Sequence, residues 1–297
     1  MNKILITCII AIFLGVNAHA DIKGASLNKI SEKTSSIISN LIPGEGLTEV
    51  DITLRDNNAG HGNIQFGVLG VRDIFANDNT NFFTQFSLHT QEINNDDRFV
   101  GNFGLGYRVL NVDQSMMFGV NTFYDQDLSE DHKRIGFGLE AKASILDFNF
   151  NEYLKATDQL TVGGFAEQNL SGRDFNLSSQ VPHMPWAIVN YNYYRWDNEK
   201  ATEDTEGQIY ALEMNLNPSL QLDISKDFSD VSGVDDEWNY RLTFKYPPQT
   251  DKPTLLDGAT SSDAFVKKNM QATLKDKVRR NNNLVIEVQG AVVVTSK

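Results

Sequence analysis

The chain has 297 residues, and its 39 Asp and Glu against 26 Lys and Arg give a formal net charge of −13. This acidic balance argues against nucleic acid or an anionic membrane surface as a partner. The one cysteine, Cys8, lies close to the N-terminus, so the chain cannot rest on a disulfide framework.

Residues 1–20 have the organisation of a secretory signal peptide. Lys3 supplies the basic start, Ile4–Val16 is the apolar stretch, and Ala18-His-Ala20 provides small residues before a cleavage site. The apolar stretch is too short to cross a bilayer as a helix. We therefore predict that these residues direct the chain out of the cytoplasm and are removed before Asp21.

Residues 21–46 precede the main domain. Apolar residues between Leu27 and Leu41 recur at roughly helical spacing, and Pro43-Gly44 would end a helix. This pattern predicts a short amphipathic helix that packs beneath the main domain.

From residue 47 to residue 246, apolar and polar residues alternate with the period of two that is typical of β-strands. In Arg134–Ser144, apolar Ile135, Phe137 and Leu139 alternate with glycines and charged residues. A tilted transmembrane strand needs about nine to eleven residues, which fits the candidates. The twelve predicted strands are Thr48–Asp56, Asn63–Arg72, Asn81–Thr90, Arg98–Leu110, Ser115–Asp125, Arg134–Ser144, Asp147–Thr157, Arg173–Val181, Trp186–Trp196, Gly207–Leu216, Leu220–Phe228 and Glu237–Tyr246.

The connections between these strands alternate in length. Those after even strands are brief, such as Asn111–Gln114 and Asn217–Ser219, whereas Asp158–Gly172 and Asp197–Glu206, after odd strands, are longer and acidic. Short turns at one end and long loops at the other indicate an outer-membrane barrel. We predict an all-β fold, a 12-stranded antiparallel β-barrel integral to the outer membrane; the alternative is a soluble β-sandwich.

The surroundings expected for such a barrel are outer-membrane lipid and lipopolysaccharide, and both of its ends lie on the periplasmic side, where we place residues 21–46. Aromatic residues near strand ends would form the interfacial girdles. They are Phe99, Tyr107, Tyr124, Trp186, Trp196, Trp238 and Tyr246.

After Tyr246 the character of the sequence changes. Pro247–Gly258 reads as an extended linker, and apolar residues at helical spacing predict a helix over Ser262–Arg280. Crossing about 30 Å of bilayer takes roughly ten extended residues, so this segment is long enough to return through the pore. The final run, Leu284–Thr295, either adds a strand to a partner's sheet edge or turns back on itself at Gln289-Gly290 as a hairpin.

Several segments carry a family resemblance. The run GVNTFYDQD at Gly119–Asp127, followed by RIGFGLE at Arg134–Glu140, resembles the barrel of the intimin–invasin family, the inverse autotransporters. Phe103–Arg108 (FGLGYR) and Arg280–Glu287 (RNNNLVIE) are similar to further segments, in the same order. The resemblance implies a twelve-stranded outer-membrane barrel whose C-terminal tail threads the pore and carries surface-exposed Ig-like adhesin domains. The sequence ends at Lys297, with room for one strand but not for an Ig-like domain of roughly 100 residues.

The resemblance directs attention to two sets of residues. The first is expected to line the pore, where glycines clear space and charges hold the tail, or where polar groups satisfy one another and bound water: Asn121, Gly136, Gly138, Glu140, Lys142, Arg241 and Lys245. The second is expected at or just beyond the pore exit: Arg280, Asn281, Asn282, Asn283 and Leu284.

No constellation in the sequence predicts chemistry. Gly60-His61-Gly62 is faintly like the histidine segment of outer-membrane phospholipases, but no matching serine nucleophile is identifiable. The spacing of Asp125, Asp127 and Ser129 hints at a calcium loop but fails the EF-hand pattern, so we interpret it as a solvated acidic loop. We expect no enzyme, no metal site and no cofactor.

The leading hypothesis is a translocator and anchor that exports and displays its own C-terminal segment, or a separate partner, for cell-surface adhesion. Its expected partners are the barrel-assembly machinery and either a separately encoded passenger or a host surface. The alternative is a simple outer-membrane channel whose tail remains periplasmic.

Overall fold

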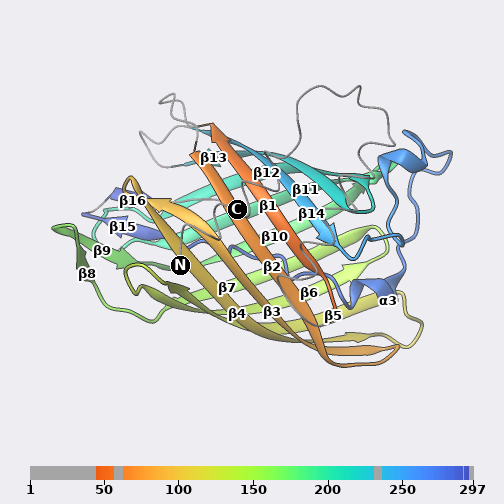
Figure 1. Ribbon diagram of the computed structural model, residues 1–297, viewed down its shortest axis with the longest axis horizontal. Coiled ribbons are helices and arrows are strands. Elements are labelled where there is room, and N and C mark those ends of the chain that lie inside the picture. The colour runs from red at the N-terminus through yellow and green to blue at the C-terminus, as the bar shows by residue number, and fades with distance from the viewer. Residues whose placement is uncertain (1–44, 57–62, 231–235, 290, 294–297) are drawn as a thin grey trace.

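The computed structural model describes residues 45–56, 63–230, 236–289 and 291–293 (Figure 1). The predicted signal peptide, the predicted helix within residues 21–46 and the turn around His61 lie outside these residues. No helix within the described ranges is long and apolar enough to span a membrane.

Twelve described strands close into an antiparallel barrel in which neighbours along the chain pair with each other, and β7 pairs with β10. β1 and β14 close the ring, with Thr48 opposite Tyr246 and Asp56 opposite Trp238. Closure leaves no unpaired edge, as a membrane-spanning sheet requires. The predicted 12-stranded barrel is confirmed. Its strands are β1 Thr48–Asp56, β2 Asn63–Ala76, β3 Thr80–Ile93, β4 Asp96–Leu110, β5 Met116–Asp127, β6 Lys133–Ala143, β7 Leu146–Lys155, β10 Ser171–Val181, β11 Met184–Asp197, β12 Thr205–Asn217, β13 Leu220–Ser229 and β14 Glu237–Tyr246.

The two ends of the barrel differ. One end, here the turn end, carries the short connections 77–79, 111–115, 144–145, 182–183 and 218–219 together with the start of β1 and the end of β14. The other, the loop end, carries longer connections such as 156–170 and 198–204. Alternation along each strand places apolar side chains outward, where Phe137 and Leu139 are about half exposed, and polar side chains inward.

Trp196, one of the predicted girdle residues, does not face outward. It is 1% exposed and packs inside the barrel with its ring centroid 5.3 Å from that of Tyr153. The girdle prediction is wrong for Trp196 because the residue shares the parity of Asn190 and Asn192, which point inward on the same strand.

A second, smaller sheet lies at the loop end. It has the order β16-β15-β9-β8, formed by β8 Leu160–Val162, β9 Phe165–Asn169, β15 Ile286–Val288 and β16 Ala291–Val293. We call it the cap sheet. β15 and β16 form the terminal hairpin that was one of the two expectations for the final run, and β15 also pairs with β9 of the chain's own long loop.

The C-terminal segment enters at the turn end and leaves at the loop end. After a short 3-10 helix, η1 Leu255–Asp257, it follows the β10–β11 turn, where Ser261 N donates to His183 O over 2.8 Å. The one-turn helix α3, Met270–Thr273, leads into the lumen, and the chain continues to the cap sheet (Figure 1). The prediction of a helix over Ser262–Arg280 is therefore wrong outside α3.

Candidate functional site in the barrel lumen

The residues predicted to line the pore all lie on inward-facing positions. Asn121, Glu140, Lys142 and Lys245 are at most 8% exposed, Gly136 and Gly138 are buried, and Arg241 is partly buried. A Cβ at Gly136 would stand 3.1 Å from Nη2 of Arg280. That glycine therefore leaves room for a tail side chain.

Glu140 acts on the tail through Arg108 of β4. Its two carboxylate oxygens accept from Nε and Nη2 of Arg108 at 3.1 and 2.9 Å. The remaining Nη1 of Arg108 donates to the carbonyl oxygens of Leu274, at 3.0 Å, and of Asp276. Glu140 thus fixes a guanidinium that grips the backbone of the tail as it enters the lumen.

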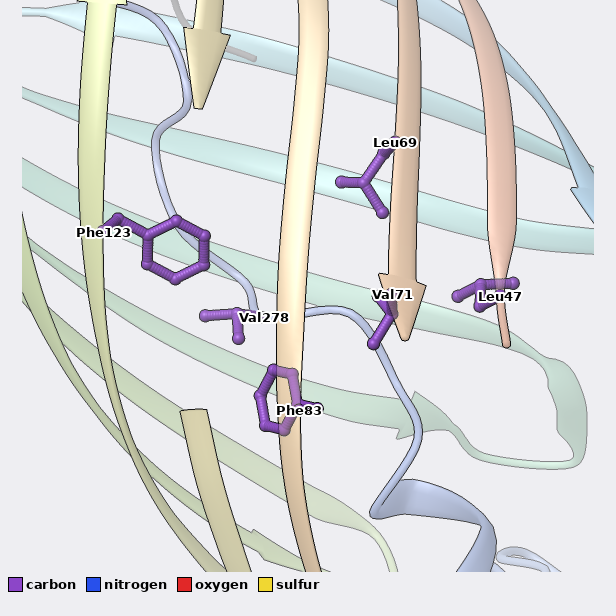
Figure 2. Packing of buried hydrophobic residues seen from close by; sticks show 6 residues of the cluster. All are labelled: Leu47, Leu69, Val71, Phe83, Phe123 and Val278. Carbon is purple, nitrogen blue, oxygen red and sulfur yellow. The ribbon is translucent and has the colours of Figure 1, made fainter. Parts of the chain in front are cut away.

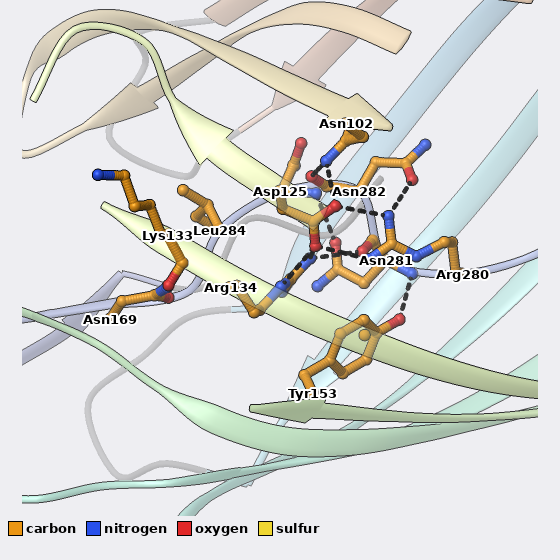
Figure 3. Close-up of polar contacts among 12 residues, drawn as sticks. Asn102, Asp125, Lys133, Arg134, Tyr153, Asn169, Arg280, Asn281, Asn282 and Leu284 are labelled. Carbon is orange, nitrogen blue, oxygen red and sulfur yellow. Dashed lines mark hydrogen bonds and ion pairs between the residues drawn. The ribbon is translucent and has the colours of Figure 1, made fainter. Parts of the chain in front are cut away.

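A buried ion-pair cluster holds the tail deeper in the barrel (Figure 3). Asp125 of β5 accepts from Nη1 and Nη2 of Arg280 at 2.9 and 2.6 Å and from Arg134 of β6 at 2.9 Å. The Arg280 guanidinium lies 4.2 Å from the ring centroid of Phe123, and that of Arg134 lies 4.2 Å from the ring of Tyr153. Two cations share one carboxylate, and both gain cation–π contacts.

Asp125 and Asp127 are fully buried, so their interpretation as a solvated acidic loop is wrong. β5 continues to Asp127, and alternation turns both carboxylates into the lumen. There Arg280 and Arg134 pair with Asp125, while Arg98 lies 3.3 Å from Asp127. Burial of a carboxylate is tolerated only with such partners.

The backbone of the tail is hydrogen-bonded by side chains of the barrel wall. Gln91 illustrates the pattern, because its amide accepts from Leu284 N at 3.0 Å and donates to Leu284 O at 2.6 Å. A buried backbone needs all its partners, and here the wall supplies those that a helix would supply internally. This explains why the segment is extended where helical spacing predicts a helix. The other contacts are Val278 N to Gln85, Arg279 O from Asn151, Asn281 N to Tyr153, Asn281 O from Arg134 and Asn282 O from Asn102.

Apolar contacts add to this polar grip. Val278 of the tail packs among five wall residues near the turn end, namely Leu47, Leu69, Val71, Phe83 and Phe123 (Figure 2). Leu284 and Ile286 pack against Ile93 and Val100 near the loop end. Residues predicted for the pore exit, Arg280–Leu284, thus lie inside the barrel, with Asn283 and Leu284 fully buried.

At the loop end two buried carboxylates fix the cap sheet. Glu287 of β15 accepts from the backbone N of Glu199, Lys200 and Ala201 at 2.8 to 3.2 Å. Glu167 of β9 accepts from Arg98 at 2.7 and 2.6 Å and lies 3.1 Å from Nε2 of His132. Burial raises the pKa of Glu167, but the Arg98 hydrogen bonds outweigh it and hold the pKa below its usual range, whereas burial lowers the pKa of His132.

Within the described part of the chain, no group of three or more His, Cys, Asp or Glu side chains could hold a metal ion. The arrangement instead immobilises the C-terminal tail inside the barrel of the same chain.

A closed antiparallel barrel with an apolar outer face and a polar lumen is an integral outer-membrane β-barrel. More particularly, the chain belongs to the inverse autotransporter β-domain family, whose model matches residues 15–282.

The chain is 27% identical over 218 residues to the inverse autotransporter adhesin YeeJ of Escherichia coli strain K12, covering 69% of this chain and 9% of that protein. It is 27% identical over 223 residues to invasin of Yersinia enterocolitica, covering 70% of this chain and 25% of invasin. It therefore spans a quarter or less of the length of these two relatives. A solved structure described as "Unveiling the Mechanism Behind the in-meso Crystallization of Membrane Proteins" shares the fold, with a TM-score of 0.65, 19% identity and coverage of 82% of this chain and 99% of that one.

Sequence reasoning missed Arg108, Arg134 and Gln91 as residues that hold the tail. The signal for Arg134 was available, since it shares the parity of Gly136 and Glu140, which were assigned to the lumen. Likewise Arg108 occupies the inward parity of β4.

Proposed function

We propose that this chain is an outer-membrane translocator and anchor of the intimin–invasin type, which carries its C-terminal segment through its own lumen for display at the cell surface. The observation that supports this most is the tail itself, which crosses the lumen from Leu274 to the cap sheet in extended form. With short turns on the periplasmic side, the cap sheet faces outward.

The wall grips main-chain atoms along the whole path, so the barrel holds the tail as a fixed anchor. Main-chain contacts suit a segment that has been exported, because they do not depend on an unbroken pattern of tail side chains. Adhesion, through material attached to the tail, a separately encoded passenger or a host surface, would then use the barrel as its base. This role belongs to type V secretion, requires no chemical step and relies on the barrel-assembly machinery for insertion.

Single-cysteine labelling tests the proposal. In a Cys8→Ser background, Gln289→Cys places a thiol at an exposed position beside the cap sheet, and Leu256→Cys places one at the turn end, where Leu256 is 58% exposed. A membrane-impermeant maleimide added to intact cells should label the first variant and spare the second until the outer membrane is permeabilised. Labelling of Leu256→Cys alone in intact cells would reject the orientation and with it the display role.

The extended tail weighs against the alternative of a channel with a periplasmic tail, because residues 274–285 run through the lumen towards the cap sheet. One observation nevertheless favours residual permeability: cavities of about 300 and 80 Å³ lie beside the tail.

A further inference from the structure

The larger cavity lies in the turn-end half of the lumen, between the tail and the wall formed by β1 and β10–β14. Leu69 of β2, Lys142 of β6 and Asn149 of β7 complete its lining, and its volume is about 300 Å³. Nine Lys and Arg side chains line it against six Asp and Glu, among the residues the structure describes. Three of these cations, Lys142, Arg241 and Arg280, lie in ion-pair contact with the carboxylates of Glu140, Asp223 and Asp125, which are not among the lining residues.

Lys245 of β14 lies at this cavity, and its hydrogen-bond partners are neutral side chains. It is 7% exposed, and its Nζ donates to Oδ1 of Asn215 at 3.3 Å and to Oε1 of Gln221. No carboxylate of the described ranges lies within ion-pair distance of this ammonium. A buried cation normally has a charged partner.

A lysine of the tail forms the ion pair with the carboxylate that stands opposite Lys245. Glu49 of β1 stands directly opposite Lys245 in the register, yet it pairs with Lys277 of the tail at 2.6 Å. Lys277 thus forms an ion pair with the carboxylate that stands opposite Lys245 in the strand register. With the tail in place, the ammonium of Lys245 faces the cavity.

Further polar groups that line the cavity lack partners. Arg241 and Thr243 share the inward parity of Lys245 on β14, and Arg241 donates through Nε to Asp223 at 2.9 Å. Oγ1 of Thr243 has no hydrogen-bond partner among the described residues, although Thr243 is 1% exposed and lines the cavity. The same holds for both amide atoms of Asn149 on β7, which is five strands away from β14 in the barrel order. Buried polar atoms normally have partners.

We propose that this cavity binds a small oxyanion of the phosphate class, with Lys245 as its principal ligand and Arg241 as the second cation. An ammonium and a guanidinium, with the unpaired hydroxyl of Thr243 between them on β14, form a donor-rich set that suits a tetrahedral oxyanion. The site depends on the tail occupying the lumen and is independent of display at the cell surface. Each time the tail is seated, Lys277 engages Glu49 and the oxyanion neutralises Lys245.

Titration calorimetry of the full chain in detergent, with inorganic phosphate as the probe at constant ionic strength and pH 7.5, tests the site. The unmodified protein should bind phosphate, and Lys245→Gln should weaken the affinity about tenfold or more, since a charge-assisted hydrogen bond is lost. Lys226→Gln is the matched control, because Lys226 lies on the outward parity of β13, remote from the cavity. It should bind as the unmodified protein does.

Glu49→Gln should change the phosphate affinity in the opposite direction. It removes a negative charge beside Lys245 and frees Lys277, so phosphate affinity should rise, whereas a variant that merely disturbed the fold would bind less. Absence of phosphate binding by the unmodified protein overturns the proposal, as does equal affinity in Lys245→Gln. A Glu49→Gln variant that binds more weakly while keeping its melting temperature also counts against it.

Discussion

Arg280 of the tail and Asp125 of β5 form a two-point ion pair inside the barrel, with N–O distances of 2.9 and 2.6 Å and at most 1% of either side chain exposed. Arg134 shares the same carboxylate. The pair joins residues 155 positions apart in the sequence, so it fixes the register of the tail against the wall.

Removing either partner should release the tail. Arg280→Ala leaves Asp125 with one cation, Arg134, and the amide of Asn102, while Asp125→Ala leaves two buried guanidiniums without their carboxylate. Loss of one member of a buried pair costs about 3–5 kcal/mol, so we expect faster proteolysis of residues 275–284 in detergent, more so in Asp125→Ala. The double variant should lose less stability of the seated tail than the two single variants lose together. Strictly additive losses would show that the pair is not coupled.

Conductance in planar bilayers should report how far the tail fills the lumen. A chain lacking residues 274–297 loses the segment that packs against both halves of the wall, so its single-channel conductance should exceed that of the full chain several-fold. Arg280→Ala, which loosens the tail without deleting it, should show brief openings to the same level. Equal conductance of the full and shortened chains would mean that the tail does not obstruct the pore.

The barrel could be predicted from sequence because its signals are local. Alternation of two residues and alternation of connection length both follow from strands that face lipid on one side and a lumen on the other. The same parity argument assigns Arg134 and Trp196 to the lumen, although the position of the tryptophan near a strand end favoured a girdle. The β8–β9 hairpin could also have been predicted from the sequence, because Gly163-Gly164 is typical of a two-residue turn between two short strands. In the structure these glycines have φ of 58° and 88° and join β8 to β9.

The path of the tail could not be read from its own sequence. Met270, Leu274 and Val278 recur at helical spacing, yet Met270 and Leu274 pack with Leu110 and Met117 while Val278 packs with Phe83. The groups that bind its backbone, such as Gln85 and Gln91, lie 193 residues away in the chain. The helical spacing of apolar residues therefore does not determine the conformation of the tail, because the hydrogen bonds and contacts with the barrel wall determine it.

Glu287 should act as a latch between the tail and the loop 198–204. Its carboxylate accepts three consecutive backbone N–H groups, and charged acceptors make hydrogen bonds roughly twice as strong as neutral ones. Glu287→Gln should therefore raise the rate of tryptic cleavage at Lys200 several-fold in the folded protein. Glu203→Gln, in the same loop but exposed, is the control and should be cleaved at the original rate. Matching rates in the two variants would remove the latch role.

Acidification should loosen the cap sheet through His132. Glu167, Asp127 and Arg98 surround this histidine, and burial holds its pKa below the ordinary 6.5. The opened state then binds more protons than the closed state as the pH falls through about 6.5. The contribution of His132 to the stability of the closed cap sheet is therefore fully present above that pH and is lost as the pH falls below it. Glu167, with a pKa held below its ordinary 4.5, adds a second loss at still lower pH.

Hydrogen exchange of residues 160–169 and 286–288 measures this opening directly. After correction for the intrinsic pH dependence of exchange, protection should fall between pH 7.5 and 5.5 in the unmodified protein. In His132→Gln the group that takes up the proton is gone, so protection over the same range should be flat even if its absolute level is lower. An unchanged slope in His132→Gln would assign the pH dependence to another group, since Glu167 remains ionised across that interval.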